Sequence, residues 1–222
     1  MLWRPLIYFS VFFFLLKIAR VYLMTMDIQG IVNKTLPLFE VHNDSEFVEV
    51  EMRFGKFNGS FFDTNVGKQV FNKVLVALQA YKGWEDIRTS SCDVFYHDAA
   101  GVRLSVDDDT GEQKMIQKQS LVREDFVNQG APLDLRFSIS REMPVSGEYE
   151  MDRKRTKRRQ SFIRKNLSID MTISSGDVVD KDAEDPNHYQ IELEIVDPGN
   201  VSCQEEYFNI MWKINDILKL LF

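Results

Sequence analysis

Hydrophobic and polar residues alternate along two short segments, one near each end of the chain. A β-strand points successive side chains to opposite faces. The first segment therefore places Glu49, Glu51 and Arg53 on one face. The second places Glu192 and Glu194 on one face, and the opposite face of each segment is hydrophobic. Carboxylates on one half-exposed strand usually face water. Two such strands in one sheet would bring four carboxylates within reach of one cation, and Mg²⁺ and Mn²⁺ prefer oxygen ligands of this kind.

Six further segments between these two have a similar pattern and are separated by turn signals. They span residues 87–96, 102–106, 114–122, 135–142, 155–162 and 166–173. The alternation is less regular in 114–122, and the pattern does not fix the register of 87–96. Each regular segment has one hydrophobic face and one face of mixed charge. If the eight strands closed into a barrel, the polar faces would line its interior and the hydrophobic faces would need cover.

Three other segments have hydrophobic residues at helical spacing and can provide that cover. They are residues 65–81, residues 202–221 and, more weakly, residues 26–36. Ser202 is expected to be the N-cap of the second helix, with Glu205 completing a capping box. The pattern predicts an α+β fold, mainly β, in which a few helices cover a barrel with a polar interior.

Six motifs follow one another along residues 47–195. They are EVEMRFG from Glu49, VRL from Val102, SISREMP from Ser138, KRRQSF from Lys157, IDMT from Ile169 and YQIELEI from Tyr189. In this order they resemble the motifs of the mRNA-capping RNA 5′-triphosphatases of fungi, protists and large DNA viruses, which are triphosphate tunnel metalloenzymes.

The resemblance implies a fold, a reaction and a cofactor. Residues 26–222 would form a single triphosphate tunnel domain, an eight-stranded antiparallel barrel. The enzyme would be a hydrolase that removes the γ-phosphate from the 5′ end of nascent mRNA, which is the first step of cap formation. Mg²⁺ or Mn²⁺ would be held on the tunnel floor by Glu49, Glu51, Glu192 and Glu194.

The resemblance also implies roles for basic and acidic residues of the other strands. Catalytic roles fall to Glu142, Arg103, Lys157, Arg159 and Asp170, and substrate binding to Arg53, Lys118, Arg103, Lys157, Arg159 and Thr172. Cations neutralise phosphate oxygens, and arginine does so as a planar fork. Glu142 would orient or deprotonate the attacking water, and Asp170 would hold a metal-bound water or a basic neighbour. Gln190 and Ser168 depart from the family pattern, in which a glutamate and a basic residue are common, and neither is given a role.

Composition limits the partners and the compartment. The formal charge of −7 over 222 residues argues against binding to duplex DNA, but not against a pocket for the end of an RNA. Two cysteines, Cys92 and Cys203, give no disulfide framework, which suits the nucleus or cytoplasm, including that of a host cell if the protein is viral. The basic run 153–159 resembles a nuclear localisation signal or an RNA-binding patch. A strand is favoured, because alternation turns Lys157 and Arg159 inward and Arg158 outward.

Residues 1–25 form a hydrophobic N-terminal extension. Its hydrophobic run, residues 6–16, is shorter than the ~20 residues of a membrane-spanning helix. Three interpretations remain open: a membrane anchor, a helix packed on the outside of the tunnel, or an upstream extension before a true start at Met24 or Met26. The last is favoured, because the resemblance begins well after this segment.

Two other functions remain open beside the capping reaction. One is hydrolysis of inorganic triphosphate, polyphosphate or nucleoside triphosphates within the same superfamily. The other is a polyanion-binding module without catalysis, against which both acidic pairs argue. The SxxEMP and KxRxS motifs favour the capping group. The next step of cap formation would require a separate guanylyltransferase, since the sequence contains no motif of that enzyme.

Residues 1–23 are predicted to be dispensable for catalysis. A chain that starts at Met24 should be soluble and should release phosphate from triphosphate-ended RNA at the full-length rate, because the predicted strands begin after it. Sedimentation and phosphate release of the two chains test this. Aggregation of the shorter chain alone would favour the packed helix, and membrane sedimentation of the full-length chain alone would favour the anchor.

Overall fold

The computed structural model describes residues 25–128, 130–176 and 185–222. The strands are β1 Val48–Phe57, β2 Phe62–Asp63, β3 Asp86–His97, β4 Val102–Asp107, β5 Gln113–Phe126, β6 Asp134–Pro144, β7 Arg153–Arg164, β8 Leu167–Ser175 and β9 His188–Ile195. The helices are α2 Ile28–His42, α3 Lys68–Ala80, the 3₁₀ helix η1 Pro198–Asn200 and α4 Gln204–Lys219. The hydrophobic run 6–16 lies outside the described residues.

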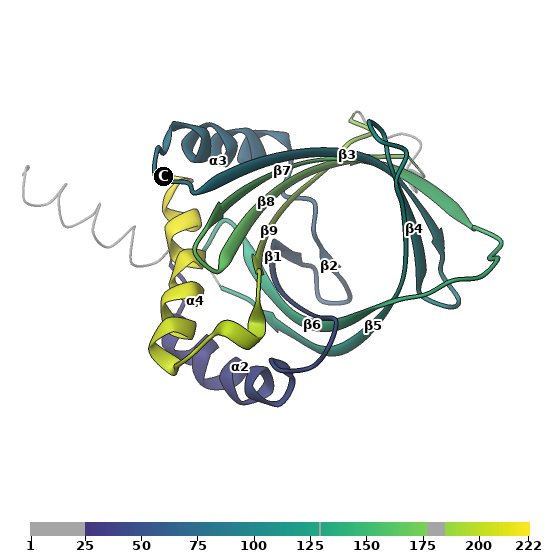
Figure 1. The fold of residues 1–222 in the computed structure, drawn as a ribbon. Coiled ribbons are helices and arrows are strands. Elements are labelled where there is room, and N and C mark those ends of the chain that lie inside the picture. Colours follow the sequence, from purple (N-terminus) through teal and green to yellow (C-terminus); the bar gives the residue numbers. More distant parts are fainter. Residues whose placement is uncertain (1–24, 129, 177–184) are drawn as a thin grey trace, which may run out of the picture.

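Eight of the strands close into an antiparallel barrel, as predicted (Figure 1). The order around the ring is β1-β6-β5-β4-β3-β7-β8-β9, and β9 pairs again with β1. Each of the eight predicted segments matches one of these strands, and 166–173 begins one residue before β8. The two-residue strand β2, which the sequence pattern did not predict, extends the far end of β1 as a short hairpin.

The main hydrophobic core lies outside the barrel, between its wall and the helices. The helices cover one side of the ring, opposite β4 (Figure 1). The outward-facing residues of β1, β6, β8 and β9 are buried beneath them, including Phe54, Phe137 and Met171. Burial of such a side chain stabilises the fold by roughly 1.5–3 kcal/mol. The helical side of the core centres on Tyr207 of α4, whose ring centroid lies 4.7 Å from that of Phe39.

The helix ends differ from the predicted caps. Cys203, not Ser202, is the N-cap of α4, and its side chain makes no capping hydrogen bond. The predicted capping box with Glu205 is therefore wrong. The backbone N–H and the hydroxyl of Ser202 instead donate to the Glu206 carboxylate, at 2.8 and 2.9 Å. Ser202 lies one residue before the N-cap, so its carboxylate partner is Glu206, four residues ahead, and not Glu205, three residues ahead.

The basic run 153–159 is part of β7, which confirms the strand interpretation. Arg158 is exposed, whereas Lys157 and Arg159 line the interior of the barrel. Both cysteines are free. None of the helices in the described ranges is long and hydrophobic enough to cross a bilayer.

Candidate active site

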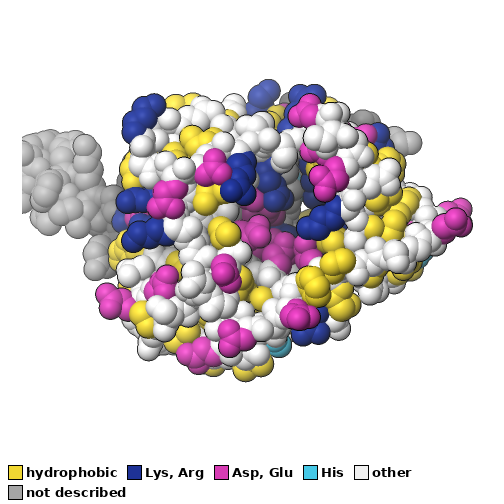
Figure 2. Space-filling model, viewed as in Figure 1, with side chains coloured by type: hydrophobic (Ala, Val, Ile, Leu, Met, Phe, Trp, Pro, Cys, Tyr) yellow, Lys and Arg dark blue, Asp and Glu magenta, His cyan; other side chains and the backbone are white. Residues whose placement is uncertain are grey.

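The barrel encloses a cavity of about 390 Å³ with a strongly charged wall. Its lining includes five glutamates and eight lysines or arginines, a formal charge of +3 inside a chain of formal charge −7. Charged side chains are visible through the opening in Figure 2, with Asp and Glu deep inside and Lys and Arg around them. Such a cavity suits a compact polyanion.

Most of the predicted site residues meet in this cavity. The predicted residues among its lining are Glu49, Glu51, Arg53, Arg103, Lys118, Glu142, Lys157, Arg159, Glu192 and Glu194. The remaining two, Asp170 and Thr172, are buried on β8 behind Arg159. The structure therefore brings all twelve predicted residues to one site.

The acidic floor is built by the β1–β9 pair. Glu51 stands directly opposite Glu194, and Arg53 stands opposite Glu192. Directly paired side chains in neighbouring antiparallel strands lie about 5 Å apart at their Cβ atoms. The guanidinium of Arg53 donates to Glu192 at 2.8 Å and to Glu51 at 2.7 Å. One arginine therefore bridges carboxylates of both strands.

Lys118 is the second cation of the floor. Its ammonium pairs with Glu49, with Glu51 at 3.4 Å and with Glu142 at 3.2 Å. The hydroxyl of Ser140 also donates to Glu49, at 2.7 Å. Lys118 thus links the acidic floor to Glu142 on β6, the candidate for orienting the water.

The four floor carboxylates differ in the direction in which their pKa is shifted. Burial raises the pKa of Glu49, but Lys118 and the Ser140 hydrogen bond outweigh it and bring that pKa down to about 2. Burial likewise opposes ionisation of Glu192, yet Arg53 and Arg159 hold its pKa below the usual range. Burial outweighs the cations at Glu51, whose pKa is raised.

Glu194 is the carboxylate that these cations leave uncompensated. Burial, followed by the charges of Glu49 and Asp170, raises its pKa to about 8. Within the described part of the chain its side chain makes no hydrogen bond and no ion pair. A buried carboxylate in this state is a place where an added cation would be strongly favourable.

The donor set fits a hard divalent cation. Four carboxylates on two neighbouring strands offer oxygen ligands, and neither His nor Cys lies among them on the floor. As the side chains are placed, no group of three Asp, Glu, His or Cys in the described ranges converges closely enough to hold a metal. Arg53 and Lys118 instead hold three of the four, Glu49, Glu51 and Glu192, in ion pairs.

Arg159 is held in place by β8. It donates to Asp170 at 2.8 Å and to Thr172 at 3.1 Å, and it lies 3.6 Å from Glu192. The Ser168 hydroxyl donates to the other oxygen of Asp170 at 2.5 Å. Asp170 therefore contacts a basic neighbour, and its two predicted roles stay predictions. Ser168, a departure from the family pattern, supports the same carboxylate.

Several residues of the cavity have no role predicted from the sequence. Tyr96 of β3 lies beneath a group of cations, with Arg153 at 4.0 Å and Arg103 at 5.7 Å from its ring centroid. The sequence pattern could not show that Tyr96 faces the cavity, because it did not fix the register of residues 87–96. Arg155 could have been found, since it shares an alternating face with Lys157 and Arg159.

A family model described as "mRNA capping enzyme, beta chain" matches residues 60–208, about two thirds of the chain. The match begins after β1, so the first acidic strand lies outside it. That strand joins the site through its pairing with β9. No curated protein matches the sequence.

The fold is similar to solved structures. An S. pombe Pct1 RNA triphosphatase structure has 16% identity and a TM-score of 0.66, with coverage of 89% of this chain and 90% of that one. Pct1 in complex with the Spt5 CTD has 17% identity and a TM-score of 0.70, with coverage of 89% and 93%. The RNA triphosphatase domain of a trifunctional mimivirus mRNA capping enzyme has 14% identity and a TM-score of 0.57, with coverage of 84% and 96%. At these identities the likeness shows the fold.

Two neighbouring arginines of β7 give a matched test of the inward register. Arg159→Ala should weaken tripolyphosphate binding at least tenfold, because a charge-assisted hydrogen bond contributes about 1.5–3 kcal/mol. Arg159→Lys should recover only part of the loss, since an ammonium cannot form the planar fork. Isothermal titration calorimetry measures both.

Arg158→Ala is the control and should bind like the wild type. A loss confined to Arg158→Ala would show that the inward register of β7 is wrong by one residue.

Proposed function

Because the chain belongs to the mRNA capping enzyme β-chain family, it is an RNA 5′-triphosphatase, and we propose that it removes the γ-phosphate of nascent mRNA with a divalent cation on the β1–β9 floor. The observation that carries this proposal is that Glu51 and Glu194 stand at directly opposite positions of β1 and β9, inside a cavity whose other walls are basic. Carboxylates alone would repel a triphosphate, whereas carboxylates that hold a metal beside a basic wall attract it.

The basic wall is proposed to bind and orient the triphosphate. Arg103, Lys157 and Arg159 line the cavity from β4 and β7. Arg159 is pre-oriented by Asp170, so little side-chain entropy is lost when a phosphate binds. Phosphoryl transfer depends mostly on positioning and on neutralising charge, which is the chemistry that this wall supplies.

The metal is proposed to be Mg²⁺ or Mn²⁺, held by Glu49, Glu51, Glu192 and Glu194. When bound, such a cation supplies Lewis-acid neutralisation of phosphate oxygens. Arg53 and Lys118 hold Glu49, Glu51 and Glu192 in ion pairs at the cavity. Both cations also line the cavity, so we assign both residues to substrate binding.

Glu142 is proposed to orient the attacking water and to accept its proton. It is half-buried on β6, 3.2 Å from Lys118 and 3.9 Å from Arg103. These two cations hold the carboxylate in place at the cavity wall. The hydrolysis leaves inorganic phosphate and a diphosphate-ended RNA.

The partners follow from this product. A guanylyltransferase must consume the diphosphate end, and we propose that enzyme as a partner of this domain. The mimivirus relative is described as a trifunctional capping enzyme, and Pct1 as forming a complex with the Spt5 CTD. We expect this protein to act where transcripts are made, in the nucleus or in the cytoplasm.

One observation favours a second candidate, a tripolyphosphate hydrolase of the same fold. The charged groups of the cavity wall are suited to binding phosphate. Tyr96 is the aromatic residue of the cavity lining, and cations cover its face. Phosphate release from triphosphate-ended RNA and from free tripolyphosphate, compared on the same chain, separates the two. A chain that hydrolyses only tripolyphosphate would contradict the capping assignment.

Metal dependence is tested by isosteric changes on both acidic strands. Glu51→Gln and Glu194→Gln should each lower γ-phosphate release on the order of a hundredfold or more, because each removes a charged ligand without changing its shape. The readout is release of labelled γ-phosphate from RNA across a Mn²⁺ titration.

Glu46→Gln is the matched control, since Glu46 is an exposed glutamate three residues before Glu49. It should leave the Mn²⁺ titration unchanged. Wild-type rates in a folded Glu51→Gln, Glu194→Gln double variant would rule out the metal assignment.

A further inference from the structure

Phe47, the residue before β1, combines two features that neither burial nor backbone preference explains. Its φ is 58°, which places it, with Lys165, among the non-glycine residues of positive φ in the described part of the chain. The left-handed conformation costs an ordinary residue roughly 1–2 kcal/mol, and glycine avoids that cost. Yet the side chain is 53% exposed, so the strained backbone carries an aromatic ring largely into water.

The backbone of Phe47 is fixed to the active site. Its carbonyl accepts a hydrogen bond from the amide of Glu142 at 2.8 Å. The next residue, Val48, pairs with Arg141 of β6, and Glu49 of the acidic floor follows. Strain at a position held on both sides by such contacts is typical of functional sites.

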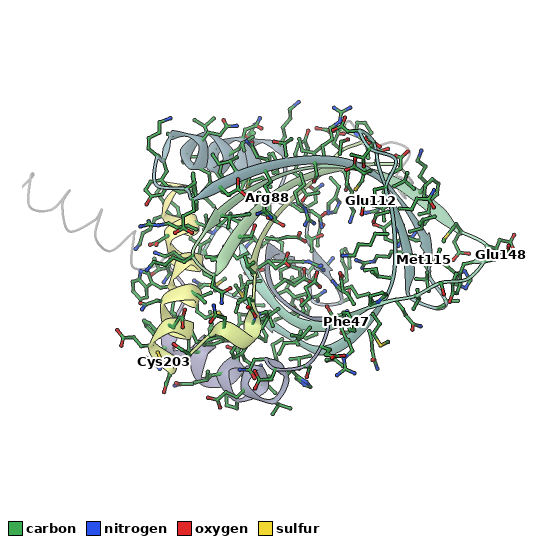
Figure 3. All side chains as sticks on the ribbon, viewed as in Figure 1. Phe47, Arg88, Glu112, Met115, Glu148 and Cys203 are labelled. Atoms are coloured by element: carbon green, nitrogen blue, oxygen red, sulfur yellow. The ribbon has the colours of Figure 1, made fainter. Side chains whose placement is uncertain are left out.

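Phe47 lies at an opening of the barrel. Figure 3 shows it on the rim beside the interior, with Met115 further along the same rim. Figure 2 shows hydrophobic side chains beside this opening and acidic side chains deep within it. A chain end that enters here passes from a hydrophobic rim to a charged interior. Such an order matches a nucleotide whose phosphates lead and whose base follows.

We propose that Phe47 is a stacking platform for the first base of a triphosphate-ended RNA. This inference rests on the proposed function and narrows its substrate from triphosphates in general to those that carry a base. Stacking on an aromatic side chain contributes about 1–3 kcal/mol per base and tolerates every base, because each has a π-face. A platform without base selectivity suits an enzyme that acts on many transcripts.

The test compares triphosphate-ended RNA, whose first nucleotide carries a base, with tripolyphosphate, which has no nucleoside. Phe47→Ala should lower the ratio of kcat/KM for triphosphate-ended RNA to kcat/KM for tripolyphosphate by roughly 5- to 150-fold, the range that corresponds to the stacking energy. The loss should lie in KM for RNA. Phe47→Trp should keep the wild-type ratio, since indole stacks at least as well.

Two further variants separate stacking from a structural role. Phe47→Gly should lower the ratio as Phe47→Ala does while keeping or raising the melting temperature, because glycine relieves the strained φ. Phe61→Ala is the matched control. Phe61 is a similarly exposed phenylalanine, at 58%, in the turn between β1 and β2 at the far end of β1. It should leave the ratio unchanged.

The inference is overturned if the ratio stays at its wild-type value in both Phe47→Ala and Phe47→Gly. It is also overturned if both substrates and the melting temperature fall together, which would make Phe47 a structural residue. A wild-type chain that hydrolyses tripolyphosphate but not RNA would reject the proposed function itself, and this inference with it. That result is seen without any variant.

Discussion

Four paired positions join β1 to β9, and the barrel depends on them. The two strands are about 140 residues apart in sequence, and the other six strands of the ring lie between them. The same pairing sets Glu51 opposite Glu194 and Arg53 opposite Glu192. Barrel closure and assembly of the acidic floor are therefore one event. A slip of one residue would turn these carboxylates into the hydrophobic layer.

The polar interior is costly, and the outer layer offsets that cost. Burying carboxylates is unfavourable unless cations and hydrogen bonds compensate them. Arg53 and Lys118 compensate the charges of some floor carboxylates by pairing with them. The charge of Glu194 is not compensated in this way, and its pKa is raised. Stability comes from the hydrophobic side chains between the barrel wall and the helices, such as Phe54 and Tyr207. The protein thus keeps a charged centre for function and a hydrophobic shell for folding.

Alternation alone predicted much of this architecture. It predicted the eight strands, the inward faces of those that alternate regularly and the three covering helices, because each such strand separates a hydrophobic shell from a polar interior. It could not place Tyr96, since residues 87–96 carry mostly uncharged inward residues. The bulge between Ser120 and Val122, which reverses the alternation within β5, also gave no signal. The Lys118 ion pairs and the Asp170–Arg159 contact depend on register between strands, which a single sequence does not contain.

The central claim is that glutamates from both ends of the chain share one divalent cation. Mn²⁺ binding to the intact chain, followed by electron paramagnetic resonance, measures this without catalysis. A double-mutant cycle with Glu51→Gln and Glu194→Gln reports whether the two residues act together. The account predicts one bound Mn²⁺ per chain, weaker binding in each single variant, and a double variant that loses less than the sum of the two losses. Independent, additive losses, or unchanged binding in either single variant, would contradict it.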